Sequence, residues 1–163
     1  MTAPPIDVRR LDEAVELARA AGHETLRWFR SDHLEIDTKG DGSPVTQADR
    51  AAERLLRREI SARYPADSII GEEEPDHRGT SPNRWVIDPV DGTKAFTHGV
   101  PLFSNLLAYF DEHGPAIGVI NLPALGETVY AGRGLGCFVN GTSCRVSTTA
   151  DLADAYVCTS GLD

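Results

Sequence analysis

The stretch Trp85–Phe96, WVIDPVDGTKAF, places two carboxylates directly after a run of apolar residues. The first three residues have the pattern of a buried strand, where an uncompensated charge is costly. Asp88 and Asp91 follow three positions apart, and Pro89 lies between them and stiffens the turn. A buried strand that ends in two rigidly held acids predicts a site that binds a cation.

A second apolar run ends in the same way. Ser68–Ile70 is followed by a glycine and by the three glutamates Glu72–Glu74. If the two strands are neighbours, their acids meet at one edge of a sheet, where packed carboxylates repel each other unless a cation is present. Oxygen ligands suit a hard ion such as Mg²⁺, and no two histidines have metal-ligand spacing. The pattern predicts that Glu72, Asp88 and Asp91 converge on a Mg²⁺ site.

The residues after Asp91 supply a second half for this site. If a helix begins at Gly92 and Thr93, its free N–H groups and positive dipole end can bind a phosphate, with the Thr93 hydroxyl beside it. There are plainer alternatives. An Asp-rich sequence ending in glycine also forms ordinary turns, and Glu72–Glu74 is also typical of a solvated charge run. Two acid-terminated apolar strands close in sequence favour the functional interpretation.

The pattern along the chain predicts an α+β fold, a mostly antiparallel sheet with two long helices packed on one face. Apolar residues recur three and four positions apart from Leu11 to Phe29, which indicates an amphipathic helix. Thr46 and Asp49 have capping-box spacing and begin a second helix, so Asp49 already has a structural role. The predicted strands are Ser68–Ile70, Trp85–Ile87, Asn105–Phe110, Ala116–Leu122, Thr128–Ala131 and Cys137–Val139.

Composition narrows the class of protein. The 163 residues are 40% hydrophobic and 25% charged, which predicts a single domain over residues 1–163. A net charge of −9 argues against nucleic acid as a partner. No run approaches the roughly 18 apolar residues that cross a membrane, and no signal peptide is recognisable. Cys137, Cys144 and Cys158 form no CxxC pair, which favours free thiols in a reducing cytoplasm.

Four segments together resemble the inositol monophosphatase family of Mg²⁺-dependent phosphatases. They are Val45–Asp49 (VTQAD), Gly71–Glu73 (GEE), Trp85–Thr93 (WVIDPVDGT) and the glycine-rich Gly132–Gly141. The resemblance covers nearly the whole chain and implies a sugar-phosphatase-like layered fold. Residues 1–163 would form its N-terminal metal- and phosphate-binding domain. The resemblance further implies that the family's second α/β domain, with a Trp-Asp motif that completes the second metal site, is absent from this sequence.

The resemblance also implies a set of metal ligands. Glu72, Asp88 and the backbone carbonyl of Val90 correspond to the ligands of a first ion, and Asp88 and Asp91 to those of a second. Glu72 would also help to hold a weaker third ion. The implied cofactor is Mg²⁺, with two to three ions, replacement by Mn²⁺ and inhibition by Li⁺.

Further residues correspond to the family's catalytic groups. Asp49 and Thr93, together with Glu72, are implied to act in catalysis, with Asp49 and Thr93 orienting the attacking water. The amides of Gly92 and Thr93 are implied to bind the substrate's phosphate. The reaction implied is hydrolysis of a phosphomonoester by a metal-activated water, without a phosphoenzyme.

The segment Gly92–Pro101, with Lys94 after the threonine, resembles the histidinol-phosphatase branch of the family. The implied function is histidinol-phosphate phosphatase of histidine biosynthesis, acting on a small phosphorylated alcohol. The sulfur-assimilation nucleotidase branch also has a lysine at the position that corresponds to Lys94. Inositol-1-phosphate, a 3′,5′-bisphosphonucleotide and a catalytically incomplete truncated domain therefore stay as alternatives. The expected partner is a second copy of the chain or a complementing C-terminal half.

Overall fold

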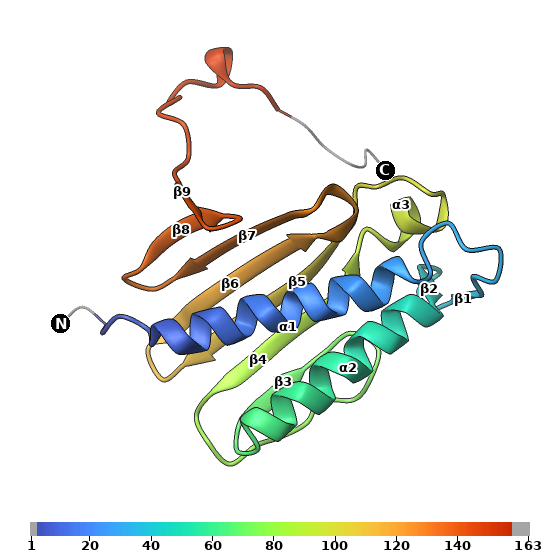
Figure 1. The fold of residues 1–163 in the computed structure, drawn as a ribbon, viewed down its shortest axis with the longest axis horizontal. Coiled ribbons are helices and arrows are strands. Elements are labelled where there is room, and N and C mark those ends of the chain that lie inside the picture. Colours follow the sequence, from blue (N-terminus) through green and yellow to red (C-terminus); the bar gives the residue numbers. More distant parts are fainter. Residues whose placement is uncertain (1–2, 158–163) are drawn as a thin grey trace.

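A computed structural model describes residues 3–157 (Figure 1). Two helices, α1 (Val8–Leu26) and α2 (Gln47–Arg63), lie side by side across one face of a seven-stranded sheet. This arrangement confirms the predicted α+β class with a mostly antiparallel sheet and two long helices. Within the described residues, no helix is long and apolar enough to cross a membrane.

The sheet has the strand order β3-β4-β5-β6-β7-β8-β9, and only β3 and β4 run parallel. Its strands are β3 (Ser68–Ile70), β4 (Arg84–Asp91), β5 (Ser104–Asp111), β6 (Gly114–Leu122), β7 (Glu127–Gly132), β8 (Gly136–Val139) and β9 (Thr142–Cys144). The smaller elements are the hairpin of β1 (Ile36–Thr38) and β2 (Pro44–Thr46), the short helix α3 (Thr93–Thr97), and the 3-10 turns η1 (Pro123–Leu125) and η2 (Leu152–Asp154). The sequence did not predict β1, β2 or β9, because these three-residue strands contain no apolar run like the one that marked β3.

The ends of the helices follow from local chemistry. The N-terminus of α2 has the predicted capping box, since Thr46 accepts from the helix backbone and Asp49 accepts from the Thr46 N–H. Helix α1 ends at Leu26, so the prediction that its pattern continued to Phe29 was wrong. The chain forms turns after Leu26, and Phe29 packs on Phe103, with ring centroids 4.9 Å apart, in a small cluster outside the main core.

The main core lies between the two helices and the sheet. Trp85 and Tyr109 are buried at its centre on adjacent strands, with ring centroids 4.8 Å apart. Helix α1 approaches the sheet closely at Gly22, where a Cβ atom would overlap the side chain of Asn121 on β6. Each helix buries one stripe of side chains and the sheet buries one face. This burial accounts for the helical and the strand periodicity of apolar residues in the sequence.

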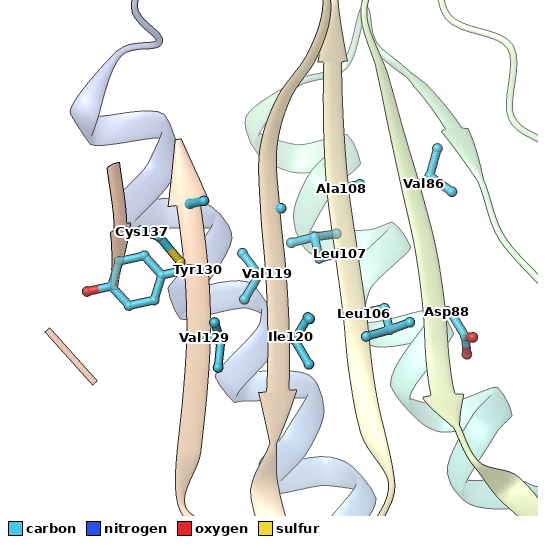
Figure 2. A pocket seen from close by; sticks show the side chains of 12 residues that line it. Val86, Asp88, Leu106, Leu107, Ala108, Val119, Ile120, Val129, Tyr130 and Cys137 are labelled. Carbon is cyan, nitrogen blue, oxygen red and sulfur yellow. The ribbon is translucent and has the colours of Figure 1, made fainter. Parts of the chain in front are cut away.

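The opposite face of the sheet is covered by neither α1 nor α2 (Figures 1 and 2). Directly paired residues share a face, so the register places Asp88, Leu106, Ile120 and Val129 in one row across β4 to β7. These side chains line a shallow apolar hollow (Figure 2). The sheet face that β5, β6 and β7 present away from the helices is therefore apolar.

The strand that carries the acids is longer than predicted. The sequence placed its end at Ile87, but β4 continues to Asp91. Its pairing with β5 shifts between Asp88 and Asp91. Pro89 lies inside this irregularity, where its missing N–H costs no ladder bond, and its carbonyl accepts a hydrogen bond from Asn105 at 2.6 Å.

Two of the three cysteines lie in the described region. Cys137 on β8 and Cys144 on β9 are both free, as predicted, although they are register partners with sulfur atoms 3.4 Å apart. Cys158 and the chain end at 160–163 lie outside the described residues.

Candidate active site

Two parallel strands bring the predicted acids to one edge of the sheet. Ile70 of β3 is the register partner of Val86 of β4. Glu72 comes two residues after Ile70, and Asp88 comes two residues after Val86. Parallel strands in register carry their C-terminal ends to the same edge. The pairing of β3 with β4 is therefore the reason that two acids sixteen residues apart in sequence (88 − 72) become neighbours.

Asp88 is the most perturbed acid at this edge. Burial raises its pKa to about 7, and the negative charges of Glu72 and Asp91 add to the shift. Its buried Oδ1 atom has no hydrogen-bond partner in the described part of the chain. A buried carboxylate oxygen without a donor, beside two further acids, is the environment that a bound cation would relieve.

Glu72 and Glu73 are paired with Lys39, from the turn between β1 and β2. The Lys39 Nζ atom lies 2.6 Å from Oε1 of Glu72 and 2.8 Å from Oε1 of Glu73. Burial disfavours the ammonium, but its hydrogen bonds to the two glutamates outweigh burial and raise the pKa of Lys39. The sequence did not single out Lys39, because it is one lysine in a loop rich in turn residues.

The predicted metal ligands are thus near one another without forming a closed cage. Among residues 3–157, no three side chains of His, Cys, Asp or Glu are arranged to surround an ion. Ser104 donates to Asp91 at 3.2 Å, and Glu72 faces Lys39. The oxygen-only donors and the unsatisfied oxygen of Asp88 fit a hard cation such as Mg²⁺.

Asp49, Thr93 and Val90 form a second group, between α2 and the end of β4. Oδ1 of Asp49 lies 3.0 Å from the Thr93 hydroxyl, which is also 2.9 Å from the carbonyl oxygen of Val90. The hydroxyl has one proton, so it donates to only one of these acceptors at a time. Burial raises the pKa of Asp49, although hydrogen bonds from Thr46 and Thr93 oppose the shift. Asp49 is therefore more basic than an exposed aspartate.

Helix α3 begins where the sequence predicted a helix start. Gly92 is its N-cap and adopts a left-handed conformation with φ of 87°, which favours glycine. Phe96 anchors this short helix by packing edge-on against Phe103, with ring centroids 4.9 Å apart. The first-turn amides of any helix have no partner within the helix, so Gly92 and Thr93 stay candidates for binding phosphate.

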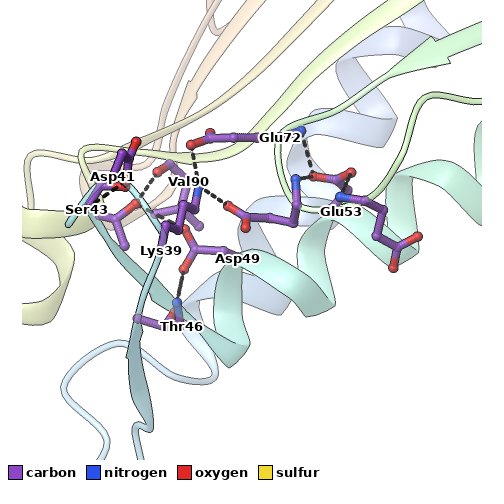
Figure 3. A network of polar contacts seen from close by, with 11 residues as sticks. Lys39, Asp41, Ser43, Thr46, Asp49, Glu53, Glu72 and Val90 are labelled. Carbon is purple, nitrogen blue, oxygen red and sulfur yellow. Dashed lines mark hydrogen bonds and ion pairs between the residues drawn. The ribbon is translucent and has the colours of Figure 1, made fainter.

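Figure 3 shows Lys39, Asp49, Glu53 and Glu72 gathered around the N-terminal half of α2. Glu53 was also missed by the sequence analysis. Its signal was a carboxylate four residues after Asp49, on the same helix face as the buried Ala52 and Leu56. The fold and this site define an α+β protein that gathers acids, a half-buried lysine and a helix start at one edge of a sheet.

Comparisons with known proteins agree with that class. The profile of the inositol monophosphatase family matches residues 7–162. A protein of Chlorobaculum parvum named histidinol-phosphatase is 48% identical over 141 residues, which are 86% of this chain and 54% of that protein. A Thermotoga maritima protein named fructose-1,6-bisphosphatase/inositol-1-monophosphatase is 42% identical over 89% of this chain and 56% of its own length.

A solved structure gives the same answer for the fold. The extragenic suppressor protein suhB of Bartonella henselae superposes with a TM-score of 0.81 at 33% identity, over 86% of this chain and 55% of that one. The chain belongs to the inositol monophosphatase family, whose members generally use Mg²⁺. It spans about half the length of the relatives that it matches.

Proposed function

We propose that this chain carries the metal- and phosphate-binding part of a Mg²⁺-dependent phosphomonoester hydrolase. The observation that supports this most is the state of Asp88, a buried carboxylate with an unpaired oxygen in the described structure and a pKa raised to about 7. Glu72, Asp88, Asp91 and the Val90 carbonyl would hold the ions. Bound Mg²⁺ supplies Lewis-acid activation of water and stabilises charge on the phosphoryl oxygens.

The protein's own groups would then orient the reactants. Thr93 lies within hydrogen-bonding distance of the buried Asp49, so the pair can hold a water and pass its proton from the hydroxyl to Oδ1 of Asp49. The amides of Gly92 and Thr93 would bind the phosphate at the start of α3. Glu72 is the third catalytic residue of this proposal, as a carboxylate that would help to hold the ions.

We propose histidinol phosphate as the substrate. The support is the 48% identity to a protein named histidinol-phosphatase and the Lys94 that follows Thr93. The relative named fructose-1,6-bisphosphatase/inositol-1-monophosphatase, at 42% identity, favours inositol-1-phosphate as the second candidate. A 3′,5′-bisphosphonucleotide is the third ester that the assay should include. A cytoplasmic location is part of this proposal, as expected for a biosynthetic enzyme with free thiols.

Metal binding and substrate choice are tested separately. Mn²⁺ titration followed by electron paramagnetic resonance should show binding that Asp88→Asn weakens by more than the roughly 10- to 100-fold typical of residues around metal ligands. Phosphate release is then compared among the three esters at saturating Mg²⁺, with the chain alone and with the C-terminal half of the Chlorobaculum parvum relative added. Equal Mn²⁺ binding by the parent and Asp88→Asn would contradict the metal assignment, and a preference for another ester would contradict the substrate.

A further inference from the structure

Glu53 is a carboxylate with 0% exposure, placed inside the helix–sheet core. A buried charge is stable only when it is paired and hydrogen-bonded. One partner is Arg57, one turn further along α2, whose Nε donates to Oε1 of Glu53 at 2.8 Å. This ion pair accounts for the charge, but most of the carboxylate's bonding capacity is directed elsewhere.

That capacity is directed at the loop after β3. The backbone N–H groups of Glu72 and Glu73 donate to Oε2 of Glu53 at 3.0 and 2.8 Å, and that of Glu74 donates to Oε1 at 3.1 Å. Arg57 holds the same loop through the carbonyl oxygen of Glu74, at 2.8 Å. Three consecutive amides on one ionised carboxylate form a strong, directional clamp.

The loop lies directly on this carboxylate. A Cβ atom at Gly71 would overlap Oε1 of Glu53 and the guanidinium of Arg57. The glycine before the glutamates is therefore required by close approach to Glu53, since its φ is not in the left-handed region. The predicted ligand Glu72 begins from a backbone that Glu53 fixes.

Helix α2 joins this clamp to the other half of the site. Asp49 and Glu53 are four residues apart, so they project from one helix face, one turn from each other. Asp49 contacts Thr93 at the start of α3, and Glu53 contacts the loop after β3. We propose that Glu53 is a positioning residue that holds the Gly71–Glu74 loop so that Glu72 faces Asp88 in the metal site. This inference rests on the proposed function.

The direct test is Glu53→Gln in the full chain. The substitution keeps the size of the side chain but replaces one acceptor oxygen with a donor, which cannot receive the loop's N–H groups. We expect native circular dichroism, faster hydrogen exchange at the amides of residues 72–74, and Mn²⁺ affinity reduced about 10- to 100-fold. Glu59→Gln, the same change at a more exposed site on α2, should leave both measurements at the parent's values.

A second variant covers the case in which Glu53→Gln does not fold. Gly71→Ala leaves the carboxylate in place and displaces the loop from the other side, so it should reduce Mn²⁺ affinity in the same way. Parent-like Mn²⁺ affinity in a folded Glu53→Gln or in Gly71→Ala would overturn the inference, whatever the amide exchange shows. Asp88→Asn distinguishes this outcome from a failure of the proposed function. If the proposed metal site is wrong, Asp88→Asn also binds Mn²⁺ like the parent; if only the inference about Glu53 is wrong, Asp88→Asn still binds Mn²⁺ more weakly.

Discussion

At the residue scale, Asp88 is the acid of the site whose pKa is raised most. Its pKa is raised from 3.8 to about 7 by burial and then by the charges of Glu72 and Asp91. An acid with a raised pKa in the folded state binds more protons when folded than when unfolded. Its stabilising effect is complete below the unfolded pKa and is lost as the pH rises through the folded pKa.

We therefore expect the metal-free chain to lose stability between about pH 5 and about pH 8, with a smaller loss in Asp88→Asn. The measurement is the urea midpoint at both pH values in the presence of a chelator. Asp32→Asn, an exposed aspartate in the turn after α1, is the matched control and should behave like the parent. If Asp88→Asn loses as much stability as the parent, Asp88 is not the group whose raised pKa causes the loss.

Thr93 should affect rate more than metal binding. Thr93→Ala removes the hydroxyl that bonds Asp49. In whichever form of the chain hydrolyses phosphate esters, alone or with the C-terminal half of the Chlorobaculum parvum relative added, we expect kcat to fall by about 100-fold or more, a typical loss when a proton-transfer group is removed. Mn²⁺ affinity should stay near the parent's value. Thr93→Ser keeps the hydroxyl and is the control. A large loss of metal affinity with unchanged turnover would assign Thr93 to metal binding instead.

At the scale of the elements, the N-terminus of α2 supports both the fold and the site. Thr46 caps the helix, and the same Asp49 that completes the capping box reaches Thr93. One short segment thus ties helix stability to the position of a predicted catalytic carboxylate.

Thr46→Ala should destabilise the chain by about 1–2 kcal/mol, the usual effect of losing an N-cap, near the upper end because Thr46 is buried. The free energy of unfolding is measured by urea denaturation followed by circular dichroism. Thr46→Ser keeps the capping oxygen and should recover most of the loss. Equal stability of Thr46→Ala and the parent would show that the cap seen here does not support α2.

At the scale of the whole molecule, the uncovered sheet face is the dominant feature. Its row of Leu106, Ile120 and Val129 is apolar, and Ile120 is 46% exposed. Extended apolar patches on protein surfaces usually mark an interface. Relatives about twice as long as this chain make a further domain one candidate to cover it, and a second copy is the other.

We expect the isolated chain to be marginally stable, to self-associate and to show weak or no phosphatase activity. Light scattering should detect particles larger than a monomer, and Ile120→Lys should shift them towards the monomer because a charge cannot be buried at the centre of the face. Val8→Lys is the control, at a similarly exposed position on α1, and should leave the particle size unchanged. A monodisperse monomer that hydrolyses histidinol phosphate as fast as a full-length relative would contradict this prediction.

Local patterns in the sequence determined the helices, the longer strands, the capping box at Thr46 and the two acid-terminated strands, because covalent spacing controls which side chains share a face. Contacts between distant segments were decided only by the tertiary structure. The parallel pairing of β3 with β4 aligned Glu72 with Asp88, and the β1–β2 turn brought Lys39 to Glu72 across 33 residues. The clamp of Glu53 on the loop after β3 and the row of apolar side chains on the open face also required strand order and helix placement, which hydrophobic periodicity does not encode.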